Sequence, residues 1–134
     1  MRYVLEFFTI ILPHPTKFCQ YFILLIENFE NFNLYSDEDG VKHIRIKSRP
    51  NKWHENDCPF CHKSCPAYDK HSSRPTTWRG LDWGGILVEV EYQTHRIICL
   101  EHGVYVAEVP WAYPGSRFTK DFDLTVAWFA SYLP

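Results

Sequence analysis

The sequence predicts an α+β fold, in which a small antiparallel β domain is followed by a C-terminal helix. Apolar and polar side chains alternate in residues 41–49 and again in residues 86–92, which is typical of half-buried strands. Apolar side chains recur at helical spacing in residues 122–133. A third observation, two pairs of Cys and His residues at short spacing, indicates what holds the strands together.

The strand expected at residues 41–49 has two distinct faces. Ile44 and Ile46 share one face, which we expect to be buried. The other face is basic and carries His43, Arg45, Lys47 and Arg49. This strand therefore predicts a half-buried sheet with a positively charged outer surface.

Turn residues and a helix cap define the remaining elements. Strands are expected at residues 95–99 and 104–109, and the polar residues 64–77, which contain prolines, are expected to form an exposed loop. Thr119 is a good N-cap, and the acidic residues of the next turn suit the helix dipole. We therefore expect a helix from Thr119 toward the end of the chain.

Length and composition fit one small domain with an arm. The chain has 134 residues, of which 46% are hydrophobic and 17% aromatic, enough to fill a compact core. We expect an apolar arm at residues 1–32, a β domain at residues 33–113, and the start of a helical segment, cut short, at residues 114–134. The arm is interrupted by prolines and lacks a cleavage site, so it suits neither a membrane span nor a signal peptide. It is either structure that covers the core or sequence translated from an early start codon.

Positive charge is concentrated in the middle of the chain. The net charge is −2, but residues 42–96 hold ten basic and six acidic side chains. A protein with this overall charge is not a general nucleic-acid binder, yet a local basic surface can contact phosphates. A solvated face without a binding function explains the same bias equally well.

Two pairs of residues predict a metal centre. Cys58 and Cys61, and likewise Cys99 and His102, are spaced so that one tight turn can aim both side chains at one point. Two such knuckles supply the four ligands of a tetrahedral Zn²⁺ site, and Gly103 supplies a backbone angle that other residues avoid. The sequence therefore predicts a structural zinc site in a zinc-ribbon-like domain. Four protein ligands leave no open position, so we expect no catalysis by this metal.

Other interpretations of the cysteines are weaker. Scattered core thiols or a disulfide framework remain alternatives, but an odd number of cysteines and the lack of a secretion signal argue against the framework. Cys65 and His62 lie near the first pair and could compete as ligands, but pairing Cys61 with Cys65 would leave Cys58 unused. We expect Cys65 to be either a buried thiol or a thiol that lies next to the ligands, and Cys19 to be a core thiol.

Several short motifs together resemble one family of transposases. From about residue 33 to the C-terminus, the chain resembles the N-terminal zinc-finger region of the ISL-three family of insertion-sequence transposases. The motifs that carry the resemblance are Cys58-Pro59-Phe60-Cys61, Ala67-Tyr68-Asp69, Trp78-Arg79-Gly80-Leu81-Asp82-Trp83-Gly84, the run 96–104 around Cys99 and His102, Val109-Pro110-Trp111-Ala112 and Arg117-Phe118-Thr119.

The resemblance implies a role in DNA binding. In that family the zinc finger precedes a helix-turn-helix segment and a DDE catalytic domain, and the first two are thought to recognise the terminal inverted repeats of the element. The resemblance implies the same four zinc ligands that the spacing predicts. We expect no enzymatic activity, because 134 residues leave no room for the catalytic domain and scattered carboxylates cannot form its site.

The sequence thus predicts a DNA-binding module of an insertion-sequence transposase, or an orphaned fragment of one, that helps to bind terminal repeats without catalysis. Weak, salt-sensitive phosphate contacts are expected. The residues expected to make them are Arg45, Lys47, Arg49, Lys63, Arg79 and Arg96.

The alternative is a structural zinc module for protein–protein interaction or dimerisation, with self-association through the apolar face of the C-terminal helix. We expect a bacterial cytoplasmic, nucleoid-associated protein with neither a membrane nor a small-molecule substrate as partner. Trp78, Trp83 and Trp111 could stack on bases, but we expect them to lie in the core.

Overall fold

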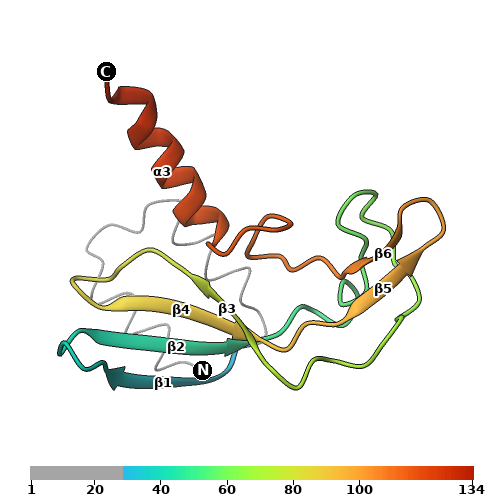
Figure 1. Ribbon diagram of the computed structural model, residues 1–134, viewed down its shortest axis with the longest axis horizontal. Helices are drawn as coiled ribbons and strands as arrows, with labels where there is room; N and C mark the ends of the chain where they lie inside the picture. The colour runs from blue at the N-terminus through green and yellow to red at the C-terminus, as the bar shows by residue number, and fades with distance from the viewer. Residues whose placement is uncertain (1–28) are drawn as a thin grey trace.

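The computed structural model describes residues 29–134. Residues 1–28, which include most of the predicted arm and Cys19, lie outside the described part. The described strands and helix confirm the predicted α+β class (Figure 1). The elements are β1 (Phe29–Ser36), β2 (Lys42–Ser48), β3 (Thr76–Arg79), β4 (Leu87–Tyr92), β5 (Arg96–Cys99), β6 (Gly103–Val106) and α3 (Lys120–Tyr132).

Four strands form one mixed sheet in the order β1-β2-β4-β3. β1 pairs with β2, and β3 with β4, in antiparallel orientation. β2 and β4 run parallel, so that Ile44 lies beside Val88 and Ile46 beside Val90. Antiparallel pairs predominate, as predicted, and the parallel pair forms the centre of the sheet. The predicted C-terminal boundary of the loop at residues 64–77 is wrong, because β3 begins at Thr76.

The two central strands have the faces that their alternation predicts. Ile44 and Ile46 of β2 are buried with Val88 of β4 in one hydrophobic cluster, against which Trp83 and Ile86 pack. The opposite face of the sheet is polar. The sheet thus rests on an aliphatic core on one side and displays charged residues on the other.

Aromatic rings fill a second cluster beneath β3 and β4. The rings of Trp78 and Trp111 lie edge to face with centroids 5.6 Å apart, and Tyr92 meets Trp111 at 5.7 Å. Both tryptophans are at least 95% buried. Trp78 and Trp111 are therefore core residues, as the sequence predicts, and Trp83 packs on the aliphatic cluster.

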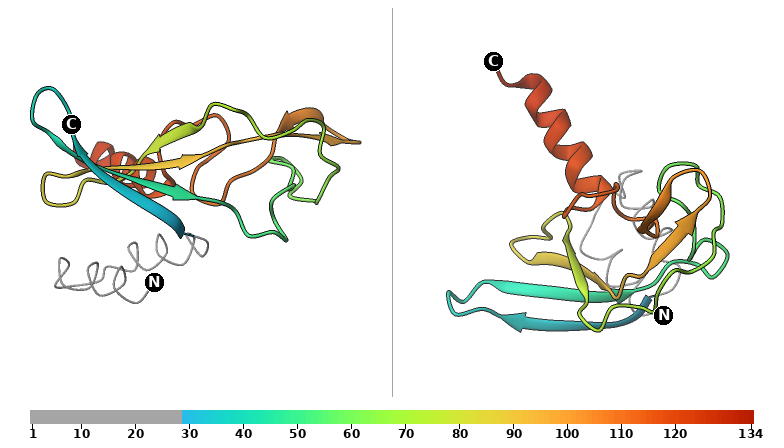
Figure 2. Two further views of the ribbon diagram at one scale, coloured as in Figure 1. Left: turned by 90° about the horizontal axis from the view of Figure 1, so that it is seen from below. Right: turned by 45° about the vertical axis from the view of Figure 1, so that its right-hand side comes forward.

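β5 and β6 form a separate antiparallel hairpin, on the right in Figure 1. Neighbouring loops extend it on both sides. The Ile98 amide donates to the Pro66 carbonyl at 3.0 Å, and the Glu108 amide donates to the Asp57 carbonyl at 2.9 Å. The second contact holds the start of the first ligand pair beside the end of β6, and Figure 2 shows this loop against the hairpin.

The C-terminal helix begins at its predicted cap. The Thr119 hydroxyl accepts a hydrogen bond from the Phe122 amide at 3.4 Å, and the Thr119 amide donates to the Arg79 carbonyl at 2.9 Å. These bonds fix the first turn of α3 against β3. Beyond that turn α3 extends away from both sheets, and none of its residues is buried (Figure 1). Its exposed apolar residues are Leu124, Val126, Trp128, Phe129 and Tyr132.

Candidate metal centre and basic surface

The first ligand pair lies in a tight hydrogen-bonded turn. The Cys58 amide donates to the Lys63 carbonyl and the His62 amide donates to the Cys58 carbonyl, each at 2.9 Å. His62 has a φ of 60°, the one positive value at a non-glycine position among the described residues. This left-handed residue lets the chain reverse directly after Cys61. The His62 ring is held on the outside by Glu108, 2.7 Å away.

The second ligand pair lies in the turn that connects β5 and β6. Cys99 pairs with Gly103 across the hairpin, and Gly103 has a φ of 90°, as predicted. A Cβ at Gly103 would meet no atom within 4 Å. The backbone angle alone therefore requires glycine. Both knuckles place a left-handed residue directly after their second ligand, His62 in one and Gly103 in the other.

The two turns bring the four predicted ligands together. Their Sγ and Nδ1 or Nε2 atoms all lie within 4.8 Å of one another. The Cys61 and Cys99 sulfurs are 3.8 Å apart, and His102 Nδ1 lies 3.5 Å from the Cys99 sulfur and 3.7 Å from the Cys58 sulfur. A zinc tetrahedron with Zn–S bonds of about 2.3 Å and Zn–N bonds of about 2.0 Å has edges of about 3.5–3.8 Å. The donor set therefore fits a closed structural zinc site held by Cys58, Cys61, Cys99 and His102.

The surroundings of Cys99 favour the form of this side chain that binds metal. The hydrogen bond with His102 lowers the pKa of the Cys99 thiol to about 6, toward the thiolate that coordinates zinc. Phe60 covers the His102 ring with centroids 5.3 Å apart. Cys65 is outside the group of four, and burial raises the pKa of its thiol to about 11. Cys65 thus sits beside the site as a neutral thiol.

Comparison with known proteins matches this region to one family. A family model described as the zinc-finger of transposase IS204/IS1001/IS1096/IS1165 matches residues 54–102, a range that contains all four ligands. Residues 54–102 are thus similar to the zinc finger of these transposases. The predicted family and the structural Zn²⁺ cofactor are thereby confirmed.

The curated relatives that match this chain are much longer. Over 108 residues it is 37% identical to the transposase for insertion sequence element IS1557 of Mycobacterium tuberculosis, in strain CDC 1551 / Oshkosh and equally in strain H37Rv. The match covers 79% of this chain and 23% of either relative. No solved structure matches the chain significantly. Within residues 29–134, no helix has the length and apolarity needed to cross a bilayer.

Arg45, Arg96, Arg79 and Lys63, which are predicted phosphate contacts, form ion pairs with carboxylates. Carboxylates at such short range offset the charge that these cations would present to phosphate. The pairs are Arg45–Glu89 (2.9 Å), Arg96–Asp69 (2.6 Å), Arg79–Asp82 (3.4 Å) and Lys63–Glu101 (3.3 Å).

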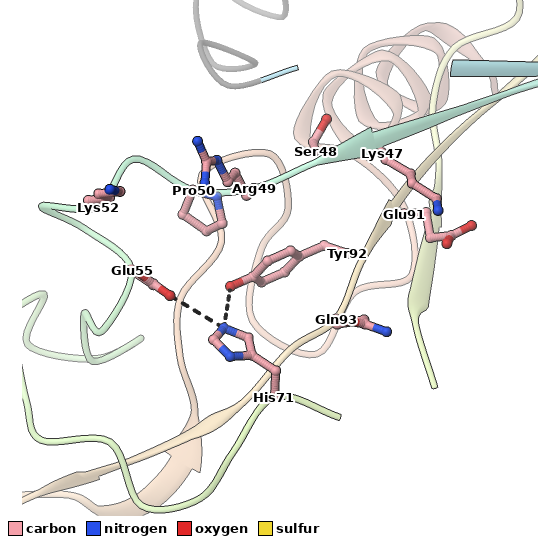
Figure 3. A pocket seen from close by; sticks show the side chains of 10 residues that line it. All are labelled: Lys47, Ser48, Arg49, Pro50, Lys52, Glu55, His71, Glu91, Tyr92 and Gln93. Atoms are coloured by element: carbon pink, nitrogen blue, oxygen red, sulfur yellow. Dashed lines mark hydrogen bonds and ion pairs between the residues drawn. The ribbon is translucent and has the colours of Figure 1, made fainter. Parts of the chain in front are cut away.

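The other two predicted contacts lie together at the end of β2. Lys47 and Arg49 line a hollow of about 470 Å³, joined by Lys52 from the turn that follows (Figure 3). His71 also lines the hollow, and its Nε2 atom lies 3.2 Å from the Tyr92 hydroxyl. The two carboxylates of the lining have partners of their own, because Glu55 lies 3.4 Å from His71 and Glu91 lies 3.6 Å from Arg45. The hollow thus has a rim of cations that spans the turn and the strand end.

The acidic residues of the described chain do not gather into a metal site. Among residues 29–134, the single group able to hold a metal is the Cys and His group described above. Asp57 contacts His54 at 2.8 Å, and Asp123 accepts a hydrogen bond from Ser116 at 2.8 Å. Each of these carboxylates has a local structural partner.

Sequence reasoning missed two residues near the hollow. Lys52 stood in a segment with no predicted element, and Trp53 beside it is 84% exposed. An alternation pattern carries no signal in a turn, so neither residue could be assigned to a face. The only hint was the position of Lys52 and Trp53 directly after the basic strand.

Proposed function

We propose that this chain is a DNA-binding module of an insertion-sequence transposase, and that it helps to bind the terminal repeats of the element without performing catalysis. The observation that carries the proposal is the cationic rim of Lys47, Arg49 and Lys52 directly before a transposase zinc finger. In this proposal the role of the zinc site is structural. It fixes the fold to which the rim is attached.

Phosphate contact by this rim predicts weak and salt-dependent binding. Three cations that neutralise three phosphates of B-DNA give a slope of about −2.7 in a plot of log K against log salt concentration. Such contacts position a protein on DNA but do not read its sequence. Arg45, Lys63, Arg79 and Arg96 are further candidates in this proposal, and each would have to leave or share a carboxylate to contact phosphate.

The test is a fluorescence-anisotropy titration with a labelled duplex at about 50 and 200 mM salt. The triple variant Lys47→Gln, Arg49→Gln, Lys52→Gln should bind at least tenfold more weakly at low salt and lose most of the salt slope. A control with the same charge change, Lys42→Gln, Lys70→Gln, Arg74→Gln, removes three exposed cations that do not line the hollow. Equal affinity of the two variants, or no binding by the unaltered protein at low salt, would refute the proposal.

The absence of catalysis and the cellular location follow from the same proposal. A DDE reaction requires three carboxylates around two metal ions, and the carboxylates of the described residues do not gather into such a group. A module that binds element ends acts where bacterial DNA is, in the cytoplasm at the nucleoid. A strand-transfer assay with this chain alone should yield no product.

A second candidate function is self-association through α3. The observation that favours it is that α3 has an apolar side with no buried residue. Two copies could cover Val126 and Phe129 against each other, as amphipathic helices commonly do. Sedimentation of the unaltered protein and of Val126→Glu, Phe129→Glu would show a concentration-dependent dimer in the first and a monomer in the second. A monomer at all concentrations in both would exclude this function.

A further inference from the structure

Trp53 is the most exposed of the five tryptophans, at 84%, although tryptophan has the largest apolar side chain to bury. Trp78 and Trp111 lie in the core and Trp83 packs on it, while Trp128 lies on α3 with 57% exposure. The Trp53 ring therefore contributes little to the packing of the fold. A ring that the fold leaves in water is available to a ligand.

The backbone that carries Trp53 is fixed. The Asn51 side-chain oxygen accepts a hydrogen bond from the Trp53 amide at 3.2 Å, and the Asn51 carbonyl accepts one from the His54 amide at 2.9 Å. The next residues are also tied down, because His54 contacts Asp57 at 2.8 Å. A ring on a constrained turn loses less conformational entropy on binding than one on a mobile loop.

Trp53 directly follows the last cation of the rim in the chain. Lys52, the preceding residue, lines the hollow with Arg49 and Lys47, and Figure 3 shows Lys52 and Arg49 on the same side of it. A nucleotide with an unpaired base offers one phosphate for a cation and one open face for an aromatic ring, so a surface that carries cations and an exposed ring on consecutive residues suits single-stranded DNA. In a duplex the base faces are already stacked on each other and are closed to Trp53.

We propose that Trp53 stacks on an unpaired base whose neighbouring phosphates contact Lys52, Arg49 and Lys47, so that this surface binds single-stranded DNA. This inference rests on the proposed function and specifies its ligand. The stack contributes affinity without base identity, because every base has a π face. Preference for unpaired over paired DNA is therefore its signature.

The experiment compares zinc-loaded full chains on a labelled 12-nucleotide strand and on the corresponding duplex. Trp53→Ala should weaken binding to the single strand by about 5- to 150-fold, the range for the loss of one base–aromatic stack. Duplex binding should change less than twofold. Trp53→Phe should retain most of the single-strand affinity, and Trp128→Ala, which removes another exposed tryptophan, should leave both affinities unchanged.

Each outcome distinguishes the inference from the proposed function. An equal affinity of Trp53→Ala and the unaltered protein for the single strand overturns the inference, as does an equal loss on both DNA forms. Binding of the unaltered protein to the duplex but not to the single strand overturns it while the proposed function stands. Binding to neither form refutes the proposed function itself. Zinc content and thermal unfolding of Trp53→Ala should match the unaltered protein, which confirms that the exposed ring has no role in folding.

Discussion

Arg45 of β2 and Glu89 of β4 are register partners in the parallel strand pair, with the guanidinium Nη2 2.9 Å from the carboxylate Oε2. The Tyr35 hydroxyl from β1 completes the contact, since it donates to the same Glu89 oxygen at 2.9 Å and accepts from Arg45 at 3.0 Å. Three strands are thus linked on the polar face of the sheet. Arg45, a cation expected to contact phosphate, is thus part of the sheet's own hydrogen-bonding network.

A double-mutant cycle on Arg45 and Glu89 should reveal a modest coupling. Arg45→Ala and Glu89→Ala should each lower the free energy of unfolding, with a coupling energy of about 0.5–1 kcal/mol, because the Arg45 side chain is 40% exposed and solvent screens the pair. Urea denaturation of the zinc-saturated variants measures it. A cycle with no coupling would mean that the pair only fills space.

The zinc site should decide whether the hairpin folds. The unaltered protein should carry one zinc per chain by elemental analysis, and Cys99→Ser should lose it together with the packing of Ile97 and Ala107, which share a cluster with Cys58 and Cys99. The apparent free energy of zinc binding, which contributes to folding, is on the order of 10 kcal/mol. Cys65→Ser is the matched control, because Cys65 packs on this cluster but is outside the ligand group. Full zinc content in Cys99→Ser would contradict the assignment.

The pH dependence of stability should show the contribution of His43. The hydrogen bond with Asp37 raises the pKa of His43 against the effect of burial, and Glu89 adds to the rise. A raised folded-state pKa stabilises the fold below the unfolded value of about 6.5, and this contribution disappears as the pH rises through the folded value. The difference in free energy of unfolding between the unaltered protein and His43→Gln should therefore shrink from about pH 6 to about pH 8.

Zinc loss at acid pH affects both proteins alike, so it cancels in this difference. The Asp37 carboxylate responds in the opposite range, because the His43 hydrogen bond lowers the pKa of Asp37 and its contribution disappears only in acid. Urea midpoints at three pH values give the measurement. A difference that stays flat across the range, or grows toward alkaline pH, would exclude this role for His43.

Local patterns in the sequence predicted local features of the structure. The alternation at Ile44 and Ile46 gave the buried face of β2, and the polar hydroxyl of Thr119 marked the start of α3. The spacing within each ligand pair predicted the metal site, because a knuckle is formed by consecutive residues. All of these features depend on side chains within about one turn of one another along the chain.

Features that depend on distant residues were not predictable in the same way. Alternation assigns a face to Arg45 and to Glu89, but it does not say that β2 and β4 are neighbours or that they run parallel. The ion pair between Arg45 and Glu89 follows from that strand pairing. β3 escaped notice because it has four residues, of which only Trp78 is buried, too few to display a period.

Substitutions at His62 test the knuckle geometry, because here the Gly variant should be more stable than the Ala variant, which is the reverse of the usual order. At ordinary positions Gly destabilises relative to Ala by about 0.5–1 kcal/mol, since glycine loses more conformational freedom on folding. At a φ of 60° a Cβ is strained, so His62→Gly should be more stable than His62→Ala by about 1 kcal/mol. Both variants remove the exposed contact with Glu108, so their difference isolates the backbone.

The equivalent position of the second knuckle provides the matched control. Gly103→Ala should lose about 1 kcal/mol through its φ of 90° alone, because no atom lies within 4 Å of the added Cβ. Chemical denaturation at saturating zinc gives both values. If His62→Ala proves as stable as His62→Gly, the first turn does not need a left-handed residue. The two knuckles would then not share the geometry that places their ligands around one ion.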